Sequence, residues 1–378
     1  MTTTMPISTP ATAAQAPFDL WALLRSNIRT IKPYSSARSE FSGTAEVFLD
    51  ANENPFGSPT NALGTNGALK AANAYNRYPD PLQKQVKARL AAVKGVEADQ
   101  LFLGNGSDEV IDLLIRAFCE PSHDSILITP PTYGMYEVSA DIQNAHVIRV
   151  PLLLDGERYA LDVEQVMAAV MPHTKLMFLC SPNNPTGTIF PTTTLHEIIH
   201  RFRGVVVVDE AYIDFAPEHT LIHDVQRFPN LVVMQTLSKA WGLAGLRLGI
   251  LVASPEIVRV LNSIKPPYNI NTLTQQHVLR ALEHTDWKER VLRITRQERE
   301  RLARELPTIQ CVQHVFPSDA NFLLVRVTAP RELYTALAQA GIIVRDRSTA
   351  PLCEGCLRIT VGTPDENTKL LEIMRSFA

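Results

Sequence analysis

The chain has 378 residues, of which 45% are hydrophobic and 20% charged, and a formal net charge of −3 from 36 basic and 39 acidic side chains. This near balance argues against nucleic acid or an anionic membrane as the main partner. The longest apolar runs, such as "VVVV" at 205–208, have the length of strands and are too short to span a bilayer.

The N-terminal segment lacks the features of a signal peptide. Residues 1–20 are rich in Thr, Ala and Pro, with no Lys or Arg and no continuous apolar core. We expect residues 1–30 to form a mobile arm and the protein to be cytoplasmic.

The cysteines favour free thiols over a disulfide framework, because five is an odd number in a long chain. Cys353 and Cys356 have the spacing of a CxxC motif, but no second pair accompanies them. We therefore expect no metal site there.

Up to about residue 275, short apolar runs alternate with amphipathic helices. We expect helices over 82–95, about 107–118, from about 133, near 161–170 and over 192–202. We expect strands in the segments "LFL" (101–103), "SILITP" (125–130), "HVIRVPL" (146–152), "KLMFLCSP" (175–182), "VVVVDEAY" (205–212), "LVVMQTLSK" (231–239) and "LGILVAS" (248–254). This alternation indicates an α/β fold, with a mainly parallel sheet sandwiched by helices.

After Pro266–Pro267 the pattern changes. A long charged helix is expected over about 284–305, followed by "NFLLVRV" (321–327), a helix at 331–340, "GIIVRD" (341–346) and "CLRITVG" (356–362). We predict a large domain over residues 31–275 and a smaller α+β C-terminal domain over residues 276–378.

Unusual polar residues follow four of the predicted strands. In open α/β sheets, functional groups gather beyond the carboxyl ends of the strands, so these segments should meet at one ligand. The four segments are "GNGSD" (104–108), "SPNNPTG" (181–187), "DEAY" (209–212) and "LSK" (237–239).

Each segment has an ordinary interpretation beside the functional one. The turn at 104–108 would expose N–H groups for a phosphate, but taken alone this segment more often forms a tight turn with a Ser or Asp N-cap. Asp209 would be costly to bury without a cationic partner, whereas a strand-end aspartate can also be solvated. A partly desolvated Lys239 would have a lowered pKa and could form a Schiff base with an aldehyde, although most lysines are solvated.

Together the segments match one ligand that carries an aldehyde, a cationic ring nitrogen, a phenolic oxygen and a phosphate. The residues for these groups are, in the same order, Lys239; Asp209; Asn184 and Tyr212; and Gly106, Ser107, Asp108, Ser238 and Arg247. Pyridoxal 5'-phosphate has all four groups, so the sequence predicts this cofactor.

The chain resembles the fold-type I aminotransferases from about residue 30 to its end. The motifs "SPNNPTG", "VVVDEAY" and "SKAWGLAGLRLG" stand in the order and at the spacings of that family. Within the family it resembles the histidinol-phosphate aminotransferase group most closely, through "PYSSAR" (33–38), "LDANENPFG" (49–57), "RYPD" (77–80), "GNGSDEVIDLLIRAFCEP" (104–121), "PPYNIN" (266–271) and "CLRITVGT" (356–363).

The resemblance implies roles for individual residues. Lys239 would bind the cofactor covalently and shuttle a proton, Asp209 would hold the ring nitrogen, and Tyr133 would stack on the ring. Tyr78 would reach the cofactor phosphate of a neighbouring subunit, which implies a homodimer. Arg358 would bind the carboxylate of glutamate or the phosphate of the other substrate. The remaining substrate-side residues would be Tyr34, Asn54, Tyr268, Asn269 and Arg345.

The implied reaction is transamination between L-histidinol phosphate and 2-oxoglutarate, giving imidazole-acetol phosphate and L-glutamate in histidine biosynthesis. An aromatic amino-acid aminotransferase and a threonine-phosphate decarboxylase on the same fold remain alternatives. A non-catalytic cofactor sensor fused to a DNA-binding head is disfavoured, because no basic helix-turn-helix segment is present. The incomplete glycine pattern disfavours a nicotinamide dehydrogenase.

Overall fold

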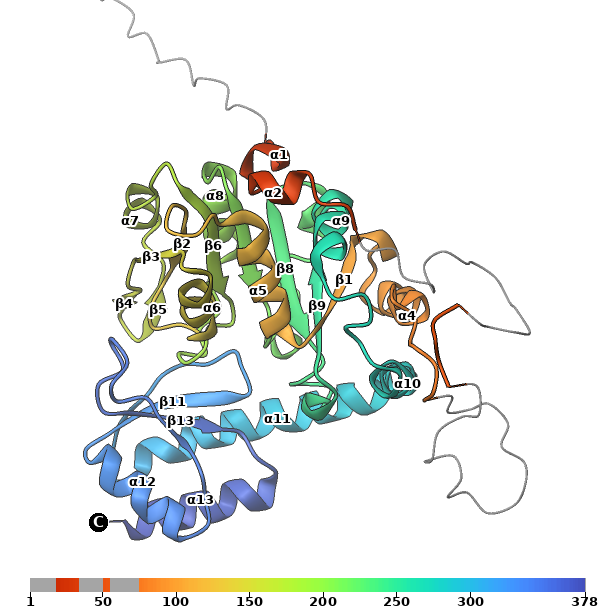
Figure 1. The fold of residues 1–378 in the computed structure, drawn as a ribbon. Coiled ribbons are helices and arrows are strands. Elements are labelled where there is room, and N and C mark those ends of the chain that lie inside the picture. The colour runs from red at the N-terminus through yellow and green to blue at the C-terminus, as the bar shows by residue number, and fades with distance from the viewer. Residues whose placement is uncertain (1–17, 34–49, 55–74, 378) are drawn as a thin grey trace, which may run out of the picture.

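The computed structural model of the chain describes residues 18–33, 50–54 and 75–377, and its centre is a seven-stranded sheet (Figure 1). The strand order is β1-β9-β8-β7-β6-β2-β3. The strands are β1 (Leu101–Asn105), β2 (Ser125–Ile128), β3 (His146–Arg149), β6 (Thr174–Cys180), β7 (Val205–Asp209), β8 (Leu231–Thr236) and β9 (Leu248–Val252). Neighbouring strands from β3 to β8 run parallel, and β9 is antiparallel to both β8 and β1. The mainly parallel sheet predicted from the sequence is confirmed.

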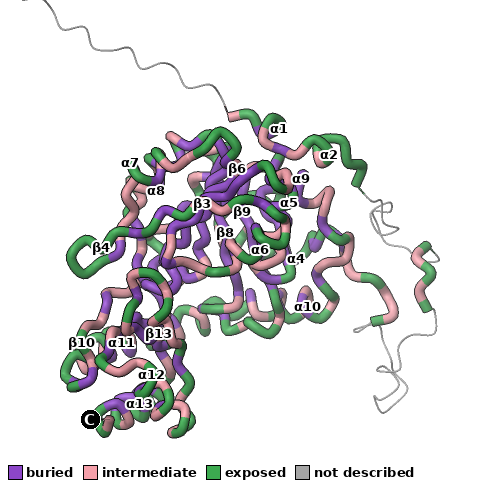
Figure 2. Tube along the Cα trace, turned by 60° about the vertical axis from the view of Figure 1, so that its left-hand side comes forward, coloured by how far each residue is buried: buried purple, intermediate pink, exposed green. Residues whose placement is uncertain are grey.

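Helices cover both faces of this sheet. They are α4 (Lys84–Lys94), α5 (Ser107–Phe118), α6 (Met135–Gln143), α7 (Val163–Ala168), α8 (Thr192–Arg201), α9 (Pro255–Ile264) and α10 (Thr272–Ala281). Because side chains alternate along a strand, Val205 and Val207 of β7 join the core with α5, α6 and α9, while Val206 and Val208 join the core with α4, α7 and α8. The central strands are therefore buried on both sides (Figure 2).

A second, antiparallel sheet forms the C-terminal part of the chain. Its strands lie in the order β10-β11-β13-β12 and are β10 (Val312–Val315), β11 (Phe322–Val327), β12 (Arg345–Asp346) and β13 (Cys356–Thr360). Its helices are α11 (Thr285–Glu305), α12 (Pro330–Gln339) and α13 (Pro364–Ser376). In Figure 1 the long helix α11 runs below the large sheet, from α10 to the small sheet.

Several element boundaries differ from the expectations. The segment 341–346 contributes only the two-residue strand β12, and Ile343 is 73% exposed instead of packing in a sheet. A short hairpin of β4 (Leu153–Asp155) and β5 (Arg158–Ala160) follows β3. Helix α10 crosses the predicted domain boundary at residue 275 and packs against α4 of the large domain. We therefore propose a boundary between α10 and α11.

The expected arm over residues 1–30 contains two short helices, α1 (Leu20–Leu23) and α2 (Ser26–Arg29). Leu20 and Leu24 are buried in the core that includes α5. The backbone N–H of Arg25 donates to the carbonyl of Ala117 at 3.1 Å. These apolar and polar contacts attach residues 20–29 to the large domain, which corrects the expectation for that part of the arm.

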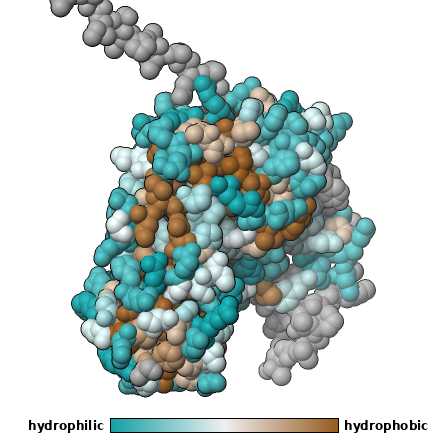
Figure 3. Space-filling view, turned by 90° about the vertical axis from the view of Figure 1, so that its left-hand side faces the viewer, coloured by the Kyte–Doolittle hydropathy of each residue, from teal (hydrophilic) through white to brown (hydrophobic). Residues whose placement is uncertain are grey.

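All five cysteines are free and buried. Within residues 18–33, 50–54 and 75–377, no helix is long and apolar enough to cross a membrane. On the face shown in Figure 3, hydrophilic residues surround separate hydrophobic patches.

Candidate active site

A pocket of about 320 Å³ lies beyond the carboxyl ends of β6, β7 and β8, between the large sheet and the C-terminal sheet. It contains residues from all four polar segments that follow the predicted strands. Its lining consists of Ser107, Asp108, Tyr133, Cys180, Asn184, Asp209, Ala211, Tyr212, Thr236, Ser238, Lys239, Arg247, Arg345, Arg347 and Arg358.

Asp209 ends strand β7 and is only 3% exposed. One carboxylate oxygen accepts a hydrogen bond from the Tyr136 hydroxyl at 2.5 Å, and the other accepts from the Ala211 N–H at 3.0 Å. Burial raises the pKa of the Asp209 carboxyl, because desolvation penalises its charged form. A cationic group in the pocket would stabilise this carboxylate.

Tyr136 is a site residue that the sequence analysis missed. Its ring is fully buried and stacks on Phe178, with centroids 4.8 Å apart and an interplanar angle of 15°. The available signal was the second tyrosine of "PPTYGMY", three positions after Tyr133. Nothing in that segment indicated that the hydroxyl would reach Asp209.

Lys239 lies just beyond the end of β8, with its amino group 5.4 Å from the centroid of the Tyr212 ring. Burial, and then the positive charge of Arg358, lower the pKa of the Lys239 ammonium group. A larger fraction of the amine is therefore neutral near pH 7, with a lone pair that can attack a carbonyl carbon or accept a proton.

The N-terminus of α5 forms one corner of the pocket. Asp108 accepts a hydrogen bond from the Tyr133 hydroxyl at 3.0 Å and pairs with the Arg247 guanidinium at 3.4 Å. Gly106 has φ of +83°, and a Cβ there would lie 2.6 Å from Nη2 of Arg247. A Cβ on Gly249 would lie 2.5 Å from the carbonyl carbon of Gly106. The two glycines thus let the turn pack closely against β9 and against the Arg247 guanidinium. This places a guanidinium beside the N-terminus of α5, and both groups can bind a phosphate.

Three arginines of the C-terminal sheet and the segment after β12 line the opposite side. Arg345 and Arg358 are cross-strand partners in β12 and β13, and Arg347 follows two positions after Arg345. The guanidinium of Arg358 donates to Oδ1 of Asn184 at 2.5 Å, which leaves the Asn184 amide N–H groups for another acceptor. Within the described part of the chain, Nε of Arg347 and of Arg358 are buried without a hydrogen-bond partner. The sequence analysis missed Arg347, whose signal was the second arginine of "VRDRS".

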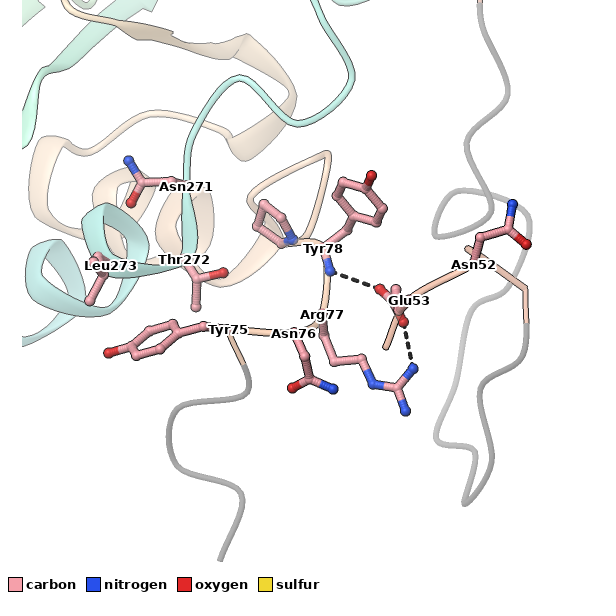
Figure 4. Close-up of a pocket in the computed structure, with 10 residues that line it drawn as sticks. Asn52, Glu53, Tyr75, Asn76, Arg77, Tyr78, Asn271, Thr272 and Leu273 are labelled. Atoms are coloured by element: carbon pink, nitrogen blue, oxygen red, sulfur yellow. Dashed lines mark hydrogen bonds and ion pairs between the residues drawn. The ribbon is translucent and has the colours of Figure 1, made fainter. Parts of the chain in front are cut away.

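Tyr78 lies in a different place. It lines a second pocket of about 490 Å³, whose lining also includes Tyr75, Asn76 and Leu273 (Figure 4). The backbone N–H of Tyr78 donates to the Glu53 carboxylate at 2.8 Å.

Three other predicted substrate-side residues, namely Tyr268, Asn54 and Asn269, are also absent from the lining of the Lys239 pocket. The ring of Tyr268 stacks on that of Tyr78, with centroids 4.5 Å apart. Asn54 is exposed, and its backbone carbonyl accepts from the Asn76 amide at 2.8 Å. Tyr34 lies outside the described residues.

Asn269 uses its side chain for contacts within the large domain. Its amide donates to the carbonyl of Leu103 at 2.9 Å and to Glu109 at 2.8 Å, while its oxygen accepts from Lys265 at 3.1 Å. These contacts hold the segment 266–271 against β1 and α5.

Known proteins resemble this chain along nearly its whole length. A family model described as aminotransferase class I and II matches residues 45–374. Proteins named histidinol-phosphate aminotransferase from Cytophaga hutchinsonii and Parabacteroides distasonis are 51% and 50% identical, each over 95% of this chain and 99% of the relative.

Solved structures agree with this relationship. The histidinol-phosphate aminotransferase from Sinorhizobium meliloti, in complex with pyridoxal-5'-phosphate, is 26% identical with a TM-score of 0.73, over 87% of this chain and 90% of that one. The histidinol-phosphate aminotransferase from Clostridium acetobutylicum has the same fold, at 24% identity and a TM-score of 0.73, over 80% of this chain and 90% of that one. Because the family match spans both sheets and the pocket between them, the chain belongs to the class I and II aminotransferases.

Proposed function

We propose that the protein transfers the amino group of L-histidinol phosphate to 2-oxoglutarate, giving imidazole-acetol phosphate and L-glutamate. The observation that carries this proposal is a single pocket with a buried carboxylate, an amine of lowered pKa and three arginines. The names of the relatives at 51% and 50% identity support histidinol phosphate as the amino donor.

The pocket fits pyridoxal phosphate as cofactor. Asp209 would hold the ring nitrogen, because the cation would offset the cost of the buried carboxylate. Tyr133 would stack on the ring, and Asn184 and Tyr212 would bind the phenolic oxygen. The phosphate would be bound by the helix N-terminus and its neighbours, namely Gly106, Ser107, Asp108, Ser238 and Arg247.

When bound, this cofactor withdraws electrons from the carbon that bears the substrate amine. Lys239 would hold the cofactor through its aldehyde. Its free amine would take the proton from that substrate carbon and would later donate a proton again. The lowered pKa suits this task, since a base works best when its pKa is near the working pH. Arg358 and Arg345 would bind the substrate anion, because the N–H groups of a guanidinium can donate to the oxygens of either a phosphate or a carboxylate.

We further propose a cytoplasmic homodimer. The position of Tyr78 in a second pocket, away from Lys239, supports a contact with the cofactor phosphate of the partner subunit. We assign both rings to the surface that would contact the partner subunit, and the stacking of Tyr268 on Tyr78 supports this assignment. Tyr34, Asn54 and Asn269 would be further residues on the substrate side of the site.

The proposed function is tested by product analysis with purified protein and pyridoxal phosphate. L-histidinol phosphate with 2-oxoglutarate should give one glutamate for each imidazole-acetol phosphate, at a much higher kcat/KM than L-phenylalanine. Equal use of phenylalanine would identify a broad aromatic aminotransferase instead. Release of carbon dioxide from threonine phosphate would identify a decarboxylase.

Gly106→Ala should weaken cofactor binding. The new Cβ would meet Nη2 of Arg247 at 2.6 Å, and φ of +83° is unfavourable for alanine. Displacing one charge-assisted contact should raise the Kd of pyridoxal phosphate by about tenfold or more, measured by titrating the cofactor-free protein. Gly134→Ala is the matched control, because among the described residues no atom beyond its two chain neighbours lies within 4 Å of a Cβ at that position. Equal affinities of the two variants would contradict this account of the turn.

Tyr136→Phe should lower kcat for amino transfer by about tenfold, since the Asp209 carboxylate would lose a hydrogen bond of a kind that contributes about 1.5–3 kcal/mol. The ring and its stacking on Phe178 would remain. The measurement is kcat together with the unfolding temperature of both proteins. An unchanged kcat would show that Asp209 does not depend on this hydroxyl.

A further inference from the structure

The pocket has an excess of positive charge on the side of the C-terminal sheet. Among its described lining residues the carboxylates are Asp108 and Asp209. The Asp108 carboxylate interacts with the Arg247 guanidinium and the Tyr133 hydroxyl. The Asp209 carboxylate accepts hydrogen bonds from the Tyr136 hydroxyl and the Ala211 N–H. Neither carboxylate makes an ion pair with Arg345, Arg347 or Arg358. Three guanidinium groups therefore converge on this side without a carboxylate from the pocket to neutralise them.

Arg347 is fixed in this cluster by its backbone. Its N–H donates to the carbonyl of Cys356 on β13 at 2.9 Å, and its carbonyl accepts from the N–H of Ala350 at 2.9 Å. The side chain lines the pocket, and its Nε is buried without a hydrogen-bond partner among the described residues. A buried donor that is left unpaired is costly, and a ligand with oxygen acceptors bound by the same guanidinium would offset this cost.

The two neighbouring guanidinium charges add to the effect of burial at Arg347. After burial, the positive charges of Arg358 and Arg345 lower the pKa of Arg347, while the thiol of Cys353 and the hydroxyl of Tyr212 raise it. An arginine nonetheless stays protonated in proteins, so the three like charges repel one another. A ligand with two negative charges relieves more of this repulsion than a ligand with one.

We propose that Arg347 is a specificity-determining residue, which with Arg345 and Arg358 selects substrates that bring two negative charges and disfavours those with a single carboxylate. This inference rests on the proposed function and deepens it. A phosphate monoester offers three acceptor oxygens and a charge of about −1.5 to −2 at pH 7. One carboxylate offers two oxygens, enough for a single bidentate guanidinium. Glutamate brings two carboxylates, whereas phenylalanine brings one.

The test is a half-reaction with the complete enzyme and its cofactor, without 2-oxoglutarate. Visible absorbance is followed after adding L-histidinol phosphate or L-phenylalanine. Arg347→Gln should lower kcat/KM for histidinol phosphate by about 10- to 100-fold and change that for phenylalanine by less than about threefold. It should also weaken inhibition by inorganic phosphate in the phenylalanine reaction. Arg331→Gln, on the exposed side of α12, is the control and should match the wild type.

Arg347→Lys keeps the charge but loses the planar pair of donors, so it should show a smaller loss of selectivity in the same direction. This second variant decides the question if Arg347→Gln does not fold. Wild-type selectivity in the folded variants, or an equal fall for both substrates, would overturn the role of Arg347 and leave the proposed function standing. A wild-type enzyme without preference for histidinol phosphate would overturn both.

Discussion

Replacing Lys239 with alanine is expected to lower kcat for amino transfer by at least about 1,000-fold. A positioned proton-transfer group contributes about 100- to 10,000-fold, and the covalent attachment of the cofactor would be lost as well. The lowered pKa of Lys239 and its place at the end of β8 distinguish it from the exposed lysines of the chain. The measurement is glutamate formation from histidinol phosphate and 2-oxoglutarate.

Lys369→Ala is the matched control, because Lys369 is exposed on α13 and is not among the described lining residues of the pocket. Borohydride reduction should fix the cofactor to the wild type and to this control, but not to Lys239→Ala. A Lys239→Ala variant that keeps wild-type turnover, or that is still labelled by borohydride, would show that another amine performs the chemistry.

Asp209→Asn is expected to lower kcat by about 100- to 1,000-fold, the range for loss of a preorganised electrostatic contact in a site shielded from water. An amide keeps the shape of the side chain and can still bond with the Tyr136 hydroxyl and the Ala211 N–H. It cannot offer a negative charge to a ring cation. The loss of activity would therefore measure the contribution of the negative charge of Asp209.

The same substitution is expected to stabilise the cofactor-free protein. Because burial raises the folded-state pKa of Asp209, the carboxyl is neutral in both states below its unfolded pKa of about 3.9 and has no cost there. As the pH rises from that value to the folded-state pKa, wild-type stability falls relative to the variant, and above it the difference stays constant. Thermal unfolding of both cofactor-free proteins should give coincident midpoints in acid and a higher Tm for Asp209→Asn at pH 8. A lower Tm for the variant at pH 8 would contradict this account.

Much of the fold was predictable because hydrophobic periodicity is a local signal. The four valines of β7 and the 3.6-residue pattern of α11 need no partner to be recognised, and α11 was expected within a residue of its observed bounds. The direction of β9 could not be seen in the same way. An antiparallel strand between β8 and β1 has the same composition as a parallel one, since it is buried on both faces.

The pocket was predictable where polar residues directly follow apolar strands, as at Asp209 and Lys239. The supporting contacts were not, because they join distant parts of the chain. Tyr136 reaches Asp209 across 73 positions, and Arg358 reaches Asn184 across 174. Such pairs leave no trace in local composition, and Arg347 was overlooked for the same reason.

Some residues that shape the site can be recognised only from the backbone geometry. Gly249 lies inside a strand, where glycine usually weakens the sheet. Its role becomes visible only from the 2.5 Å approach of the Gly106 backbone to the position of its missing Cβ.

The most direct test of the central claim is the half-reaction of the wild-type enzyme, purified with pyridoxal phosphate and free of 2-oxoglutarate. The visible band of the bound cofactor is followed after L-histidinol phosphate is added, and in a parallel sample after L-phenylalanine. We expect fast loss of the band with histidinol phosphate, far slower loss with phenylalanine, and one equivalent of imidazole-acetol phosphate per active site. A protein that does not take up the cofactor, or whose band is unaffected by histidinol phosphate, would contradict the account.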